Sequence, residues 1–120
     1  MSIAKLGAVV LDCPDPVALG RFYAELLGGE IEDDSEGWVD LKGVPGAPLA
    51  FQLSPGHVPP KWPSPEKSQQ FHLDVTVEDM DAAEERVLAI GATVLDAADR
   101  KRSWRVYADP AGHPFCLCAC

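Results

Sequence analysis

The sequence has little positive charge: 10 Lys and Arg residues face 19 Asp and Glu residues, and the formal net charge is −9 at pH 7. A protein that neutralises nucleic-acid phosphates needs a basic face, and docking on an anionic membrane needs one as well. We therefore expect neither a nucleic-acid nor a membrane partner. The acidity is compatible with a cationic ligand, although acidic solubility is the simpler explanation.

Long apolar runs are also missing. The N-terminal run extends only from Leu6 to Leu11, which is shorter than a signal-peptide core and far below the roughly 20 residues of a membrane span. We therefore expect a cytoplasmic protein, whose four cysteines stay reduced rather than form disulfides. A chain of 120 residues fits one domain that needs no metal or disulfide for stability.

The sequence does contain one internal repeat, found by comparing it with itself at an offset of 64 residues. At this offset Ala8 to Leu11 align with His72 to Val75, and Phe51 to Leu53 align with Phe115 to Leu117. Both halves show an apolar strand, an Asp turn, an amphipathic helix, a Gly stop and further strands. We therefore predict an α+β fold built from two copies of one module.

The first module is predicted to cover about residues 5–54. After a strand over 6–11, Asp15 caps a helix that begins at Pro16, because proline at the first helical position loses no hydrogen bond. The helix has one apolar face and ends at Gly28. An acidic edge segment over 30–34 and strands over 38–41 and 49–53 complete the module.

The second module is predicted to cover about residues 70–118, with a strand over 71–77 and a helix from Asp79 to Gly91. Strands over 93–95, 104–107 and 115–118 follow. The connector, residues 55–69, is rich in proline and cannot form regular structure. Loops of that length are often functional lids. We place no domain boundary there and predict a single domain over 1–120, because neither half alone would bury its sheet.

Several features recur in a fixed order: Phe22-Tyr23 on the first helix, Leu27-Gly28 at its end, His72 at the start of the second half, and Asp109 to His113 before the last strand. This ordered set resembles the glyoxalase/bleomycin resistance/dioxygenase superfamily, also called vicinal oxygen chelate, in its glyoxalase-like domain branch. The resemblance covers essentially the whole chain. It implies two tandem βαβββ modules that form a curved mixed sheet around a cavity, and a homodimer.

Enzymes of that superfamily hold a divalent metal at four equivalent positions, which the resemblance carries over to Ala8, Gln52, His72 and Cys116. Ala8 cannot bind a metal, Gln52 is a weak neutral donor, and Cys116 offers a soft thiol where a hard carboxylate is usual. The glutamate that moves a proton in glyoxalases is missing as well. We therefore expect no metal cofactor, and a metal-dependent lyase is disfavoured.

His72 and Asp74 lie two residues apart on one strand and would share a face. The pair is either a polar group of the cavity, with Asp74 orienting His72, or a hydrogen-bonded pair within the core. Cys116, Cys118 and Cys120 would also share a face. They fit core packing and a frayed terminus better than a soft-metal site, because three thiols on one straight strand do not converge.

Two histidines and one tryptophan lie outside the predicted elements. His57 and His113 are in turns, where we expect them to be exposed. Trp62 lies in the proline-rich connector, where it either covers the mouth of the cavity as a lid or anchors the connector.

We predict a metal-independent protein that binds a small aromatic or cationic organic molecule, as antibiotic-sequestering relatives do. The candidate ligand-binding residues are Gln52, His72, Asp74, Cys116, Trp38, Trp62 and Trp104. The alternative is an enzyme: a glyoxalase-like lyase or dioxygenase with a non-standard metal site, or a metal-free enzyme with His72 as general base.

Overall fold

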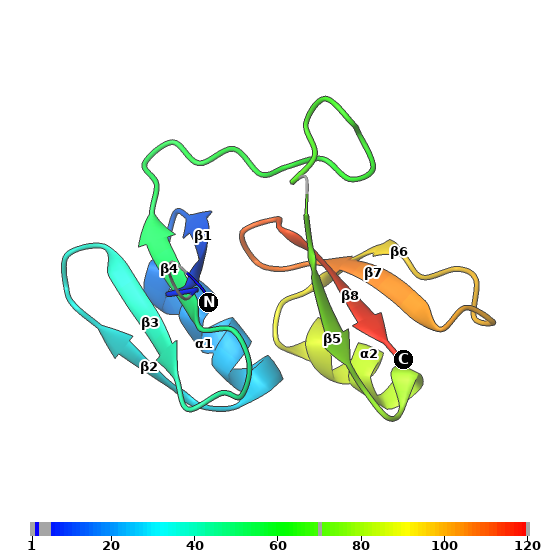
Figure 1. Ribbon diagram of the computed structural model, residues 1–120. Helices are drawn as coiled ribbons and strands as arrows, with labels where there is room; N and C mark the ends of the chain where they lie inside the picture. The colour runs from blue at the N-terminus through cyan, green and yellow to red at the C-terminus, as the bar shows by residue number, and fades with distance from the viewer. Residues whose placement is uncertain (1, 3–5, 70, 120) are drawn as a thin grey trace. The chain divides into compact units, whose positions relative to one another are not determined.

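The computed structural model describes residues 2, 6–69 and 71–119. The chain divides into two compact units, Met1–His57 and Val58–Cys120. Each unit contains one four-stranded sheet and one helix (Figure 1). Neither helix is long and apolar enough, over the described residues, to cross a membrane.

The first unit has the strand order β1-β4-β3-β2, in which β1 and β4 are parallel and the other pairs are antiparallel. Its elements are β1 (Val9–Cys13), α1 (Pro16–Leu27), β2 (Glu30–Asp33), β3 (Trp38–Lys42) and β4 (Leu49–Leu53). The acidic segment forms the edge strand β2, as the sequence predicts.

Helix α1 begins and ends where its capping residues predict. The Asp15 side chain accepts a hydrogen bond from the Ala18 N–H at 3.1 Å, and Pro16 follows at the first helical position. At the other end Gly28 has a φ of 85°, a backbone conformation that favours glycine. Gly20 brings the helix close to the sheet, since a Cβ there would lie only 3.0 Å from Val39.

Strand β1 corrects the prediction for the first strand. The prediction placed the strand over 6–11 and assigned Asp12 and Cys13 to a turn, whereas β1 runs over Val9–Cys13. The reason is register: β1 pairs with β4 from Val9 opposite Leu49 to Cys13 opposite Leu53. A strand's bounds follow its partner, which a run of apolar residues does not reveal.

The second unit repeats this topology, with the order β5-β8-β7-β6 and a parallel pair formed by β5 and β8. Its elements are β5 (Leu73–Thr76), α2 (Met80–Ala89), β6 (Thr93–Asp96), β7 (Trp104–Ala108) and β8 (Pro114–Cys118). The predicted α+β fold of two tandem modules is therefore confirmed.

In the second unit the start of one strand differs from the prediction, whereas the start of the helix agrees with it. Strand β5 is shorter than the predicted 71–77, so His72 lies just before the strand. Asp79 caps α2 as predicted, accepting from the Ala82 N–H at 3.0 Å. Residues 54–69, all of them described, contain no helix or strand, in agreement with the predicted irregular connector.

Candidate ligand pocket of the second unit

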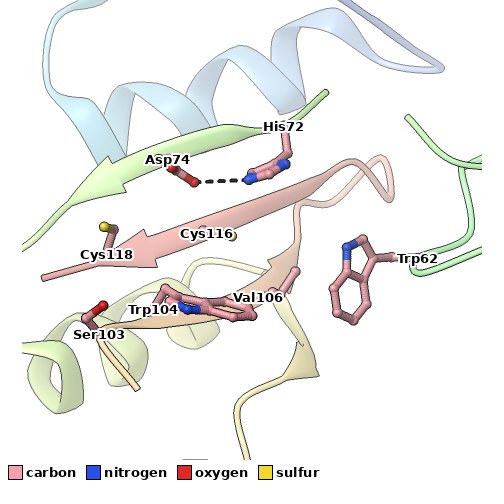
Figure 2. A pocket seen from close by; sticks show the side chains of 8 residues that line it. All are labelled: Trp62, His72, Asp74, Ser103, Trp104, Val106, Cys116 and Cys118. Atoms are coloured by element: carbon pink, nitrogen blue, oxygen red, sulfur yellow. Dashed lines mark ion pairs between the residues drawn. The ribbon is translucent and has the colours of Figure 1, made fainter. Parts of the chain in front are cut away.

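A pocket of about 450 Å³ lies on one face of the sheet in the second unit (Figure 2). Side chains alternate along each strand, so β7 directs Trp104 and Val106 to the pocket and Arg105 to the other face. Strand β8 likewise contributes Cys116 and Cys118 to the pocket. The part of the pocket formed by β7 and β8 therefore follows from strand alternation.

The register of the sheet places pocket residues in rows across neighbouring strands. Asp74 of β5 pairs with Cys116 of β8, and Cys116 pairs in turn with Val106 of β7. The next row contains Cys118 and Trp104. A carboxylate, a thiol and an apolar side chain thus lie side by side on one surface.

His72 and Asp74 are in contact, as their spacing predicts. The His72 Nε2 atom lies 3.1 Å from Asp74 Oδ1, and the two side chains are 48% and 61% exposed. The alternative of a pair enclosed within the core is therefore wrong. Cys116 Sγ completes a cluster in which the three potential ligand atoms lie within 4.8 Å of one another.

Cys116 holds a protonated thiol at neutral pH. Burial raises the pKa of Cys116 to about 11, and the neighbouring Asp74 carboxylate acts in the same direction by its charge and by hydrogen bonding. Because the thiolate is the reactive form of cysteine, this thiol is a weak nucleophile. Cys116 therefore lines the pocket as a small, polarisable, neutral group.

Trp104 is oriented by an arginine stacked on its ring. The guanidinium carbon of Arg102 lies 3.8 Å from the ring centroid. Arg102 is itself held by Asp96, whose carboxylate accepts hydrogen bonds of 3.0 and 3.2 Å. Trp104 is 39% exposed, so the sheet presents a fixed aromatic residue to solvent.

Trp62 reaches the same pocket from the connector, which contacts the second unit on both sides of this residue, through Pro59 and Gln69. The Gln69 side chain contacts the ring of His113 at 2.5 Å and donates to the Pro114 carbonyl at 3.4 Å. Pro59 packs so closely on Gly112 that a Cβ on the glycine would clash with it. The half-buried Trp62 is therefore part of an anchored segment, which favours the anchor over the lid.

Two further predictions need correction. His113 is buried, not exposed, because its ring bonds Gln69 and its N–H donates to Asp109; His57 is half-buried. Cys13 and Cys116 are not in disulfides, but Cys118 is, which contradicts the expectation of reduced thiols for this residue. Cys120, the third cysteine of the predicted row, lies outside the described residues.

The pocket gathers five of the seven predicted binding residues: Trp62, His72, Asp74, Trp104 and Cys116. Gln52 and Trp38 belong to the first unit, where they pair across β4 and β3, and they do not line this pocket. Three lining residues, Ser103, Val106 and Cys118, were not among the predicted binding residues. Alternation from Trp104 would have identified Val106, whereas nothing in the sequence marks Ser103.

The residues present do not fit the four-ligand divalent site of the superfamily's enzymes. Ala8 has no donor atom, and Gln52 supplies a neutral amide. In the second unit the available donors are one nitrogen, one oxygen and one sulfur. Hard ions such as Mg²⁺ and Mn²⁺ prefer carboxylate, carbonyl and water oxygens, so this set does not suit them.

A doubled βαβββ topology with a pocket on the sheet face defines a class of small α+β proteins, and sequence comparison assigns the family. The model of the glyoxalase-like domain matches residues 8–118, and the chain belongs to that family. No curated protein is similar enough in sequence to count as a match.

Solved structures support the same fold. A glyoxalase/bleomycin resistance protein/dioxygenase family enzyme from Burkholderia phytofirmans PsJN is 19% identical, with a TM-score of 0.72 over 95% of this chain and 97% of that one. The fosfomycin resistance protein FosX from Mesorhizobium loti is 15% identical, with a TM-score of 0.71 over 99% and 94%. The oxidase ChaP-H2 is 20% identical, with a TM-score of 0.64 over 97% and 93%. At these identities the likeness shows the fold alone.

Proposed function

We propose that this protein binds a small aromatic or cationic organic molecule in the pocket of the second unit, without a metal cofactor. The observation that supports the proposal is the composition of the lining: two indole rings, Trp62 and Trp104, share one pocket with the carboxylate of Asp74. Aromatic faces attract planar ligands and cations, and a carboxylate attracts cations.

The size and polarity of the pocket suit such a ligand. A volume of about 450 Å³ lies within the range of roughly 300–1,000 Å³ that is usual for small-molecule sites. Val106 and the two indoles supply apolar surface, while His72 and Asp74 supply the few polar groups that orient a ligand. The pocket thus combines affinity from apolar contact with a small set of directional contacts.

Indole contacts contribute more to the affinity than the carboxylate does. Asp74 is 61% exposed, and water screens an exposed charge pair so that it contributes only about 0–1 kcal/mol. A cation over an indole face contributes about 0.5–2 kcal/mol, and ring stacking adds to this. We therefore expect aromatic cations to bind more tightly than aliphatic cations.

The net charge of −9 supports the same preference, because a negative protein attracts cations over a longer range than the pocket itself. This attraction weakens with salt, since the screening length is about 8 Å at physiological ionic strength. Affinity for an aromatic cation should fall as salt is raised, whereas affinity for a neutral aromatic analogue should not.

The experiment is a thermal-shift screen followed by calorimetry, with chelator present throughout. Compounds are arranged in matched sets: an aromatic cation, its neutral isostere and an aliphatic cation of the same charge. We expect stabilisation in the order aromatic cation, neutral aromatic, aliphatic cation. A screen in which no compound shifts the melting temperature would contradict the proposal, and so would compounds that bind only in a parallel screen with added metal and no chelator.

Two other expectations from the sequence, a homodimer and a cytoplasmic location, stay predictions. Light scattering of the full chain would test the first by giving the molar mass in solution. Fractionation of the producing cells would test the second.

A further inference from the structure

Three side chains with three different donor elements meet on the pocket face of the second unit (Figure 2). They are the imidazole of His72, the carboxylate of Asp74 and the thiol of Cys116, with donor atoms within 4.8 Å of one another. Asp74 and Cys116 are direct partners in the parallel pair of β5 and β8. Unlike three thiols along one strand, these donors come from two neighbouring chain segments, residues 72–74 and β8, and they converge.

The cluster also has room to close around an ion. Ligand atoms in a tetrahedral zinc site lie about 3.3–3.8 Å apart, given metal–ligand distances of roughly 2.0–2.3 Å. His72 and Asp74 are 48% and 61% exposed, so their side chains can move by the small distance required. The third donor, Cys116, is fixed in β8 and buried, which gives the site one rigid ligand.

The donor chemistry selects the class of ion. One thiolate, one imidazole and one carboxylate suit borderline and soft divalent ions such as Zn²⁺, Co²⁺ and Cd²⁺. The cluster opens on a pocket of about 450 Å³, which leaves a fourth position for water. A single carboxylate offers little to Mg²⁺ or Ca²⁺, which prefer several oxygen ligands.

From this geometry we infer that His72, Asp74 and Cys116 bind a thiophilic divalent ion, one per chain, within the second unit alone. Binding exchanges the thiol proton of Cys116 for a sulfur–metal bond and releases that proton to solvent, with no change of oxidation state. The set differs from the four-position site of the superfamily's enzymes, because it uses Asp74 and needs neither Ala8 nor Gln52.

The ion and the proposed organic ligand would use the same carboxylate. A bound ion neutralises Asp74 and lies where the positive charge of an organic cation would lie. The organic ligand needs no ion, so we expect the two occupants to exclude each other. Zinc should therefore weaken the binding of an aromatic cation and spare that of its neutral isostere.

The test uses the full chain, stripped with chelator and kept free of reductant, and titrated with Co²⁺ and then Zn²⁺. A cobalt–thiolate bond gives a charge-transfer absorption in the near ultraviolet, which no other ligand here produces. We expect this band at one Co²⁺ per chain, its loss when Zn²⁺ is added, and no effect of Mg²⁺. A titration without the band, or a band that Mg²⁺ removes, would overturn the inference.

Three variants assign the ligands. Cys116→Ser should abolish the band, and Asp74→Asn should weaken Zn²⁺ binding by about tenfold or more, as losing a metal ligand or its support does. The matched control is Cys13→Ser, because Cys13 is also a buried cysteine outside any disulfide but belongs to β1 of the first unit. A band that persists in Cys116→Ser or disappears in Cys13→Ser would contradict the assignment.

A second readout covers the case in which Cys116→Ser does not fold. In the wild-type chain, Zn²⁺ should protect Cys116 from alkylation, as mapped by peptide mass, and His72→Ala should remove this protection. Because these measurements contain no organic ligand, their failure leaves the proposed function intact. Conversely, a failed compound screen leaves the metal titration intact.

Discussion

The two units share one strand order, yet their helices pack on their sheets by different chemistry. In the first unit α1 buries Leu19, Phe22 and Tyr23, and the Tyr23 ring stacks on Phe51 with centroids 5.5 Å apart. In the second unit Val87 alone is buried among the residues of α2, all of which are described. The first interface is apolar, whereas in the second an ionic network joins the apolar contact made by Val87.

The ionic interface centres on an arginine of β7. Arg105 is 4% exposed; it donates to Asp81 at 2.9 Å and lies 3.5 Å from Glu84. The Tyr107 hydroxyl donates to the other oxygen of Glu84 at 2.9 Å. Burial raises the pKa of Tyr107 to about 12, and the Glu84 carboxylate contributes to the shift, so the hydroxyl stays a donor at neutral pH.

The comparison shows that the topology of the repeat does not fix what holds it together. Alternation along β7 sends Arg105 and Tyr107 to the helix and Trp104 and Val106 to the pocket. A buried ion pair gives less stability than apolar packing of similar volume, because both charges lose hydration. We therefore interpret the first unit as the better-packed scaffold, and the second as the unit that contains the proposed ligand pocket.

The largest expected effect is the loss of an aromatic ring from the apolar interface. Phe22→Ala should lower the free energy of unfolding by about 3–5 kcal/mol, because the ring is removed and a cavity is left. Phe22 is 3% exposed and packs edge-on against Tyr23 at 5.0 Å. Urea unfolding measures the change, and a loss below about 1 kcal/mol would show that this interface is not the better-packed one.

Removing the central charge of the ionic interface should have a smaller effect. Glu84→Gln keeps the shape of the side chain but removes the negative charge that compensates buried Arg105. We expect the free energy of unfolding to fall by about 2 kcal/mol. This is below the usual value for a broken buried ion pair, because Glu84 is 15% exposed. The matched control is Glu85→Gln, since Glu85 is exposed on the same helix. Equal losses in both variants would remove the special role of Glu84.

The pocket itself is tested by neutralising its carboxylate. Asp74→Asn should weaken an aromatic cation about fivefold, consistent with about 1 kcal/mol for a partly exposed charge pair, and leave the neutral isostere unchanged. Asp40→Asn is the control, because Asp40 accepts a hydrogen bond from a tryptophan, Trp38, in the first unit. Calorimetry measures both, and an equal effect of the two substitutions would place the ligand elsewhere.

The smallest expected effect is on how the alkylation rate of Cys116 depends on pH. Its pKa is raised to about 11, so the thiolate fraction is small at neutral pH and rises about tenfold per pH unit until the pKa is reached. Asp74→Asn should lower the pKa and speed alkylation at a given pH. Peptide-mapped alkylation rates measure this, and a rate that levels off near the ordinary thiol pKa of about 8.5 would contradict it.

Much of the fold could be predicted because residues close together in the sequence determine where its helices begin and end. Asp15, Pro16 and Gly28 define the ends of α1, Asp79 defines the start of α2, and the offset of 64 residues reveals the repeat. The bounds of β1 could not be predicted in this way, since they depend on which residues of β4 lie opposite. Pairing register is a long-range property.

The candidate site divides in the same manner. The contact of His72 with Asp74 was predicted from strand alternation, and it is present although His72 lies just before β5. The burial of His113 and Arg105 could not be predicted, because polar residues are normally exposed and their partners, Gln69 and Glu84, lie far away in sequence. The burial of these two side chains can be explained only when the residues that form hydrogen bonds or ion pairs with them are known.

The most direct test of a ligand pocket in the second unit uses Trp38→Phe, which leaves Trp62 and Trp104 as the tryptophans of the chain. Both line the pocket, so the fluorescence of this variant reports the pocket. We predict that an aromatic cation quenches or shifts the emission in a saturable way, with chelator present, and that Asp74→Asn weakens the response. Emission that stays unchanged across the matched compounds, while calorimetry detects binding, would contradict the account.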